Sequence, residues 1–371
     1  MQARFIEKWF ARYKLFIALH FSFCYIQRVD RSARFQTICL MLITLIAIGG
    51  VLHFTQQVVL PLVIASLLSF ILGPLVIRMH RSRLPYLVGI GAVMLLLILI
   101  MVALGILLSS SFYSLIKEYP RYQERFIGLY RTLTERFQLN EWLFNDFSWM
   151  RTVGSYLVDL SGRLVELVLY AGLVLLFLFF LLLEWRHFPR KMIRALHRSL
   201  TARIARIIEH ISAEVSRYLL VKFLISLGTG LLVWAVYTLI GLDFPFIWGL
   251  LAFLFNFIPN IGSTVVWLFS SIFAVIQFYP DWHNPLFISV SMIAIQMVMG
   301  NLLEPKLTGE RLNLSPVVVL FSLLFWGWLW GIAGMFIAVP LTVIVKIICE
   351  NIPQLQAVSI LMGTAPKHRK K

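Results

Sequence analysis

The sequence has 371 residues, of which 60% are hydrophobic and only 13% are charged. Its mean hydropathy of +0.86 excludes an ordinary soluble domain, in which about 45 to 50% of residues are apolar and about 25% are charged. The net charge of +16 does not indicate nucleic-acid binding, because neither a zinc-ligand spacing nor a basic recognition helix accompanies it. We therefore expect an all-α protein that crosses a membrane several times.

Residues 1–36 combine seven basic side chains with many aromatic ones, which predicts an amphipathic helix on the cytoplasmic face of the membrane. Six hydrophobic stretches follow that are long enough, at about 20 residues, to cross the hydrocarbon core as helices. These six predicted spans are 37–54, 57–77, 85–108, 164–185, 217–240 and 285–303.

The distribution of Lys and Arg predicts the orientation of these spans. Three arginines follow the second span, and seven basic residues lie between positions 186 and 206, so both loops are expected in the cytoplasm. Residues 109–163 have seven basic and six acidic side chains, a balance that predicts a small external helical insertion. The basic tail at 351–371 is expected in the cytoplasm, like the amino terminus.

Two further hydrophobic stretches, 244–278 and 315–348, are each interrupted by polar residues, proline or glycine. The apolar arms of the first have about 13 to 16 residues and reach roughly 20 to 24 Å as helices, less than the hydrocarbon core of about 30 Å. We therefore expect two re-entrant hairpins, one from the outside and one from the cytoplasm, whose interruptions meet near the midplane. Spans 37–108 would then precede a core transport region at 164–350, because broken helices at membrane depth are typical of substrate pathways.

The candidate residues of the pathway lie at or near these interruptions. They are Asn256, Pro259, Asn260, Gly262, Gln296, Asn301, Gly327, Trp330, Gly331 and Gly334. The two asparagines of the first interruption, Asn256 and Asn260, could bind a neutral polyol or a monovalent cation, or could cap the helix ends freed at Pro259. Gln296 could face the same cavity or hydrogen-bond between helices.

Lys222 and Glu304 are candidates for a gate or for coupling, because an ionisable residue in a membrane segment is costly and often functional. Both lie near predicted span ends, so that interfacial pairing is an alternative. No catalytic or nucleotide-binding motif occurs among the eight histidines and 21 glycines, and we expect neither an enzyme nor a cofactor or metal. The three cysteines, Cys24, Cys39 and Cys349, are expected to be free thiols.

Two segments carry a family resemblance. NFIPNIG at 256–262 resembles an element of the autoinducer-2 exporter family, the PerM-type permeases, and so does the block at 300–346. The matching residues of that block are Asn301, Pro305, Ser315, Pro316, Trp326, Gly327, Leu329, Trp330, Gly331, Gly334, Ala338, Pro340 and Leu341. The resemblance extends from about residue 40 to 355. Ser315 is a departure, because many members have histidine there, and it puts in doubt a proton relay at this position.

The resemblance implies a secondary transporter of the bacterial inner membrane that works by alternating access. Members are associated with export of the autoinducer-2 signal, and others with exchange of sodium for protons. The resemblance also implies a homo-oligomer, with a pentamer as the expectation. A membrane scaffold that does not transport is the alternative from another functional class.

Overall fold

The computed structural model describes residues 31–82, 84–137, 162, 164–185, 198–259, 261–308 and 314–363. These residues are almost entirely helical and form no strand; the one β-type pairing among them is an isolated bridge between Leu314 and Gly363. The predicted all-α fold class is confirmed. The chain divides into two compact units, 1–59 and 60–371.

The described part of the first unit consists of α2 (Arg31–Phe54) and the start of α3 (Gln56–Arg81). Helix α2 contains the first predicted span. The amphipathic helix predicted for residues 1–36 lies outside the described residues up to position 30, as does Cys24, and the basic end of the tail lies outside them from position 364.

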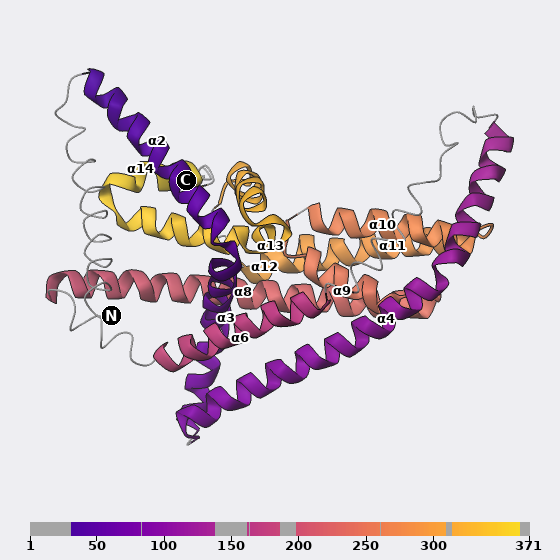
Figure 1. Cartoon of the computed structure of the whole chain (residues 1–371), viewed down its shortest axis with the longest axis horizontal. Coiled ribbons are helices and arrows are strands. Elements are labelled where there is room, and N and C mark those ends of the chain that lie inside the picture. The colour runs from indigo at the N-terminus through magenta and orange to yellow at the C-terminus, as the bar shows by residue number, and fades with distance from the viewer. Residues whose placement is uncertain are drawn as a thin grey trace, which may run out of the picture. The chain divides into compact units, whose positions relative to one another are not determined.

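The second unit holds the remaining helices (Figure 1). In chain order they are α3, α4 (Tyr86–Phe137), α6 (Leu164–Trp185), α8 (Arg198–Ile240), α9 (Pro245–Phe255), α10 (Ile261–Phe278), α11 (His283–Gln296), the π-helix η3 (Met297–Leu303), α12 (Glu304–Thr308), α13 (Pro316–Asn351), the 3-10 helix η4 (Pro353–Leu355) and α14 (Gln356–Met362). Among the described residues, seven helices are long and apolar enough to cross a membrane. The chain therefore has the architecture of a polytopic membrane protein.

Helices α10 and α4 differ in length from the sequence-based expectation, and α8 begins at Arg198, well before the predicted span at 217–240. Helix α10 has 18 residues, about 27 Å at 1.5 Å per residue, so this arm of the first hairpin is longer than predicted and is one of the seven apolar helices. Helix α4 does not end near residue 108 but continues for 52 residues to Phe137. The third span and the first half of the predicted insertion are therefore one helix.

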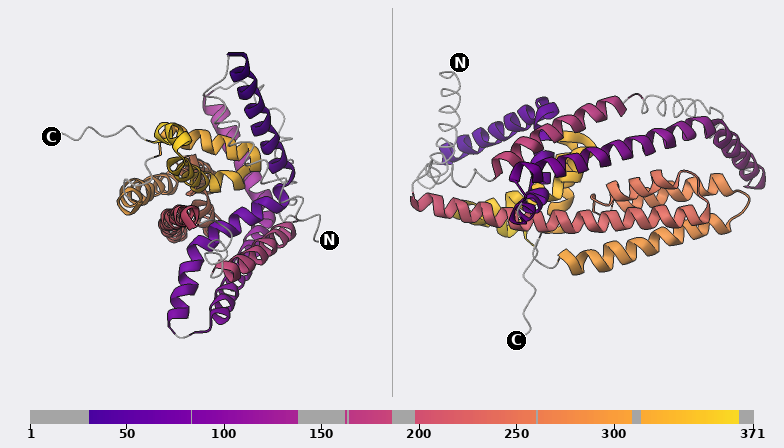
Figure 2. Two further views of the ribbon diagram at one scale, coloured as in Figure 1. Left: turned by 90° about the vertical axis from the view of Figure 1, so that its left-hand side faces the viewer. Right: turned by 90° about the horizontal axis from the view of Figure 1, so that it is seen from below.

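Two groups of helices have separate hydrophobic cores in the second unit. Helices α3, α4 and α6 pack around Ala65, Val76, Ile90, Leu178 and Leu182. Helices α8, α9, α10 and α11 pack around a second cluster that includes Val233, Tyr237, Ala252, Ala274, Ile288 and Met292. Figures 1 and 2 show α9, α10 and α11 along one half of α8, with α13 and α14 toward its other end. We call the end near Ile240 and Phe278 the predicted outer end.

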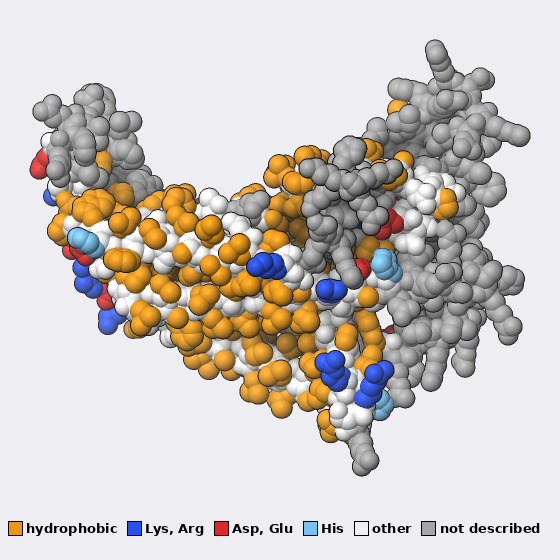
Figure 3. Space-filling model, turned by 180° about the vertical axis from the view of Figure 1, so that it is seen from behind, with side chains coloured by type: hydrophobic (Ala, Val, Ile, Leu, Met, Phe, Trp, Pro, Cys, Tyr) orange, Lys and Arg blue, Asp and Glu red, His pale blue; other side chains and the backbone are white. Residues whose placement is uncertain are grey.

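Much of the remaining surface is apolar. Hydrophobic side chains cover most of the helical face in Figure 3. Exposed leucines and isoleucines also recur along α4, for example Leu95, Leu99 and Ile106. A surface of this kind is stable only in contact with lipid or with other protein. The fold therefore agrees with the membrane location that composition predicts.

Helices α8 and α9 make their closest approach where two glycines face each other. A Cβ atom on Gly230 would lie 2.7 Å from the carbonyl oxygen of Gly249. A Cβ atom on Gly249 would lie 2.7 Å from the carbonyl oxygen of Gly230. Small residues allow helix backbones to approach in this way in membranes. This crossing fixes the first hairpin against α8.

We expect Gly230→Ala to lower the free energy of unfolding by about 1 to 3 kcal/mol, because the added methyl group overlaps the α9 backbone. Thermal unfolding of the purified protein in detergent measures the effect. Gly105→Ala in α4 is the matched control, since no described atom lies within 4 Å of its added Cβ. A stability equal to that of the control would contradict this view of the crossing.

Candidate functional site

The first interruption is a tight turn between α9 and α10. Pro259 has no backbone N–H, and its ring clashes with a helical carbonyl one turn earlier, so it favours a break in the helix. Proline alone does not force the break, because Pro74 and Pro120 lie inside α3 and α4. Three backbone N–H groups of the turn donate to α9 carbonyls: Asn256 to Ala252 at 3.1 Å, Phe257 to Leu254 at 3.1 Å and Ile258 to Phe255 at 2.9 Å. The turn thus supplies the partners that broken backbone needs at membrane depth.

Gly262 allows the two arms to close. A Cβ atom at this position would lie 1.7 Å from the carbonyl oxygen of Phe255, far inside van der Waals contact. Pro259 beside it is half-buried, and Asn260 lies outside the described residues. The role of Gly262 is therefore to shape the turn, and its backbone lies directly against the end of α9.

Asn256 connects the turn to α8. Its side chain is buried, with 4% exposure, and its Nδ2 donates a hydrogen bond of 3.0 Å to Oγ of the fully buried Ser226. This bond links the first turn to α8 rather than to the α9 backbone. The amide therefore joins the first turn to α8 in the interior of the second unit.

Ser226 belongs to a polar face of α8. Lys222, Ser226, Thr229 and Tyr237 recur at helical spacing, and all four are buried. Residues three or four positions apart lie on one side of a helix, so these side chains form a line along α8 toward the first hairpin. Thr229 donates to the Ile225 carbonyl at 2.9 Å, and Tyr237 shares a hydrogen bond of 2.9 Å with Ser270 of α10.

One end of this line carries charge. The Lys222 ammonium lies 2.6 Å from Oε1 of Glu304, and the side chains are 4% and 26% exposed. A buried ammonium is costly without a partner, and Glu304 supplies it from the first position of α12. The sequence indicated both residues as a pair, and the structure places them in contact.

The segment before Glu304 is the π-helix η3, which joins α11 to α12. Gln296 precedes it and packs its amide over Gly300, where a Cβ would lie 2.4 Å from Nε2. The buried Oε1 of Gln296 has no hydrogen-bond partner among the described residues. π-helical turns occur often at functional sites, and an unsatisfied buried oxygen is available to a polar ligand.

The second interruption lies within α13, at Trp330 and Gly331. Gly331 has φ 64° and ψ −148°, a conformation that glycine adopts without steric cost. The helix then folds back on itself. The evidence is that Oγ of Ser322 donates to the Ala338 carbonyl at 3.1 Å and also contacts Thr342. Residues 16 and 20 positions apart would lie about 24 and 30 Å apart in a straight helix. The predicted second hairpin is therefore present.

Glycine also makes this second turn compact. A Cβ on Gly334 would lie 2.0 Å from the Trp326 carbonyl oxygen, and one on Gly327 would lie 2.7 Å from the Met335 side chain. Trp330 is buried, and its ring centroid lies 5.0 Å from that of Trp326. Gly327 and Gly334 thus shape the turn, and Trp330 fills it.

The two interruptions are in contact. Ile258 of the first turn packs in one apolar cluster with Leu323 and Ala338, which belong to the two arms of α13. The ring centroid of Phe336 lies 6.5 Å from that of Phe257 and 6.3 Å from that of Phe255. The two turns therefore touch each other, while their predicted position near the midplane stays a prediction.

Not every residue that the sequence predicted for the pathway lies near the two turns. Asn301 is exposed on η3 and is not among the buried polar residues. Conversely, the sequence reading missed Ser226, Thr229, Ser322 and Thr342, which provide buried hydroxyl groups near the two turns. The helical spacing of Lys222, Ser226 and Thr229 was the available signal, but serine and threonine are common in membrane helices for packing alone.

A family model described as AI-2E family transporter matches residues 42–354. The chain belongs to the AI-2E transporter family. The AI-2 transport protein TqsA of Escherichia coli is 32% identical over 340 residues, which cover 89% of this chain and 96% of TqsA. A candidate transport protein of Borreliella burgdorferi is 32% identical, covering 89% and 91%, and the candidate permease PerM of Escherichia coli is 27% identical, covering 84% and 92%.

Membership identifies the chain as a multi-pass membrane transport protein of the AI-2E family. The names of the family and of these relatives are those of transporters and permeases and not of enzymes, in agreement with the sequence-based expectation. The hairpins and the polar face of α8 lie within the matched range.

We expect Glu304→Gln to lower the free energy of unfolding by about 3 kcal/mol, because it leaves the Lys222 ammonium buried without a counter-charge. Combining it with Lys222→Met should recover part of that loss. Thermal unfolding in detergent measures both variants. Glu118→Gln is the control, since its ion pair with Arg121 at 3.3 Å is exposed and should contribute less than about 1 kcal/mol.

Proposed function

We propose that this protein is a secondary transporter of the bacterial inner membrane that moves a small polar solute by alternating access between its two hairpins. The observation that carries the proposal is the contact of the two interruptions beside a line of buried polar side chains on α8. Broken helices that meet around a polar site are a recurring arrangement in secondary transporters.

The solute would be held by neutral groups. Ser226, Thr229, Asn256 and Gln296 provide hydroxyl and amide groups that donate and accept hydrogen bonds. Such groups suit an uncharged polyhydroxylated molecule, and autoinducer-2 as the solute is supported by the name of the relative, AI-2 transport protein TqsA. The proposed direction, out of the cell, rests on the same family resemblance.

Lys222 and Glu304 would close the pathway at the end opposite the predicted outer end. Their ion pair joins α8 to α12 across 2.6 Å, so solute could leave or enter there only after the charges separate. The glycines at the turns, Gly262 and Gly331, would let the hairpins shift without adding side-chain bulk. Trp330, Gly327 and Gly334 would support this movement from the second hairpin.

A second candidate is exchange of a monovalent cation for protons. The charge pair is the observation that favours it, because the Glu304 carboxylate could bind a proton or a cation in place of Lys222. A homo-oligomer, with a pentamer as the expectation from the family resemblance, would cover part of the apolar surface in Figure 3.

Flux into proteoliposomes tests transport directly. With autoinducer-2 as solute, we expect Asn256→Ala to reduce the initial rate at least tenfold, because it removes the amide between the hairpin and α8. Asn284→Ala is the matched control, since the Asn284 amide bonds to Asp281 in the loop before α11. Absence of flux with autoinducer-2, other polyols and monovalent cations would contradict the proposal and favour a scaffold.

A cross-link between the hairpins tests their relative movement. In a protein without its native cysteines, a pair introduced as Phe257→Cys and Phe336→Cys and joined by a short thiol cross-linker should block flux. Cleavage of the cross-linker should restore it. The control pair Phe70→Cys and Trp185→Cys joins α3 to α6, whose rings lie 5.5 Å apart, and should leave flux unchanged. Full flux through cross-linked hairpins would contradict alternating access at this contact.

A further inference from the structure

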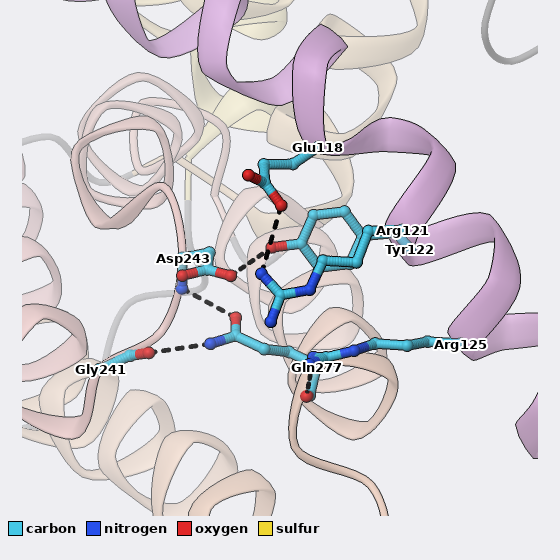
Figure 4. A network of polar contacts seen from close by, with 7 residues as sticks. All are labelled: Glu118, Arg121, Tyr122, Arg125, Gly241, Asp243 and Gln277. Atoms are coloured by element: carbon cyan, nitrogen blue, oxygen red, sulfur yellow. Dashed lines mark hydrogen bonds and ion pairs between the residues drawn. The ribbon is translucent and has the colours of Figure 1, made fainter.

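Helix α4 contacts the first hairpin at the predicted outer end. Figure 4 shows Tyr122 and Arg125 of α4 reaching the two ends of this hairpin. The Tyr122 hydroxyl donates to the carboxylate of Asp243, just before α9, and the Arg125 guanidinium donates to the backbone carbonyl of Gln277, near the end of α10. One helix thus binds both the entry and the exit of the hairpin.

The side chain of Gln277 ties these two ends to each other. Its Oε1 accepts a hydrogen bond of 2.8 Å from the backbone N–H of Asp243, and its Nε2 donates one of 2.8 Å to the Gly241 carbonyl. We call these two ends, at Gly241–Asp243 and Gln277, the mouth of the hairpin. The bonds of Gln277 join the two sides of the mouth without any contribution from α4. The two bonds from α4 involve a carboxylate and a guanidinium, and charge-assisted hydrogen bonds are stronger than neutral ones.

Aromatic packing holds Tyr122 in this position. Its side chain is buried, with 8% exposure, and its ring centroid lies 4.9 Å from that of Phe273 and 6.1 Å from that of Phe244. Phe244 has φ 56°, a left-handed conformation that non-glycine residues rarely adopt. Non-glycine residues persist in such conformations where the surroundings hold them, often at switch regions.

We propose that Tyr122 and Arg125 form an outer clamp, which holds the mouth of the first hairpin against α4 and must release before the pathway opens at the predicted outer end. This inference rests on the proposed function, in which the first hairpin moves. The clamp and the ion pair of Lys222 with Glu304 act at opposite ends of the same helical group. Each would close one side of the pathway, as alternating access requires.

The accessibility of a buried thiol tests the clamp. Ser271 of α10 has a buried hydroxyl without a hydrogen-bond partner among the described residues, and it lies seven residues, about 10 Å, from the end of α10. In a protein whose native cysteines are replaced by serine, Ser271→Cys is labelled with a membrane-impermeant thiol reagent in spheroplasts and in inverted vesicles. We expect Tyr122→Phe combined with Arg125→Gln to raise the labelling rate at least tenfold in spheroplasts only.

The control is Arg121→Gln, which lies next to Tyr122 and one turn before Arg125 on α4. Arg121 pairs with Glu118 of its own helix, so this change should leave labelling unchanged. When Arg125→Lys replaces Arg125→Gln in the double variant, the positive charge is kept, and labelling should be slower than in the original double variant. If the double variant is too unstable to purify, Tyr122→Phe alone keeps the aromatic packing and should still accelerate labelling at least threefold.

Labelling does not require flux, so the two proposals fail separately. Unchanged labelling in a folded double variant that still transports would overturn the clamp and leave the proposed function intact. Faster labelling together with a lack of flux in the parent protein would support the clamp and count against transport of the solutes tested. An increase confined to inverted vesicles would overturn the assignment of the clamp to the outer side.

Discussion

A membrane offers no water to a broken helix, so every backbone group that the break frees must find a partner within the protein. The rest of this structure depends on that constraint. The turn between α9 and α10 pairs its own N–H groups and is covered by Leu323 and Ala338 of the second hairpin. The reversal in α13 is covered in turn by Ile258 and the phenylalanines beside it. Each interruption is thus covered in part by apolar side chains of the other.

The buried polar groups have a cost that packing alone does not explain. Replacing a buried ion pair by well-packed apolar residues is often neutral or stabilising, yet Lys222 and Glu304 are kept in a protein in which 60% of residues are hydrophobic. Gln296 retains a buried oxygen without a partner among the described residues. Neutral donors and acceptors surround the turns, whereas the full charges lie at one end of the α8 face. This distribution fits a pathway that selects its solute in one place and is closed in another.

Five of the six predicted spans coincide with helices that are long and apolar enough to cross a membrane, because segment length and charge are local properties of the sequence. The arm after Pro259 was estimated too short, and α4 was expected to end near residue 108, since polar residues on a continuing helix look like a boundary. The π-helix at Met297–Leu303 has no signature in a single sequence. The hydrogen bond of Asn256 to Ser226 joins residues 30 positions apart, and such partners follow from the packing of α8 on α9, which glycines 230 and 249 determine.

The contacts at the two ends of the first hairpin differ in kind. Its tip meets the second hairpin through apolar side chains, whose attraction is non-directional and survives small sliding movements. Its mouth is held by hydrogen bonds from Gln277, Tyr122 and Arg125, which weaken steeply when their angles change. A hairpin held in this way can slide at its tip against the second hairpin. At its mouth it separates from α4 in a single step, when the hydrogen bonds break. Two discrete closures joined by a sliding contact are what a carrier needs, since both ends must not open together.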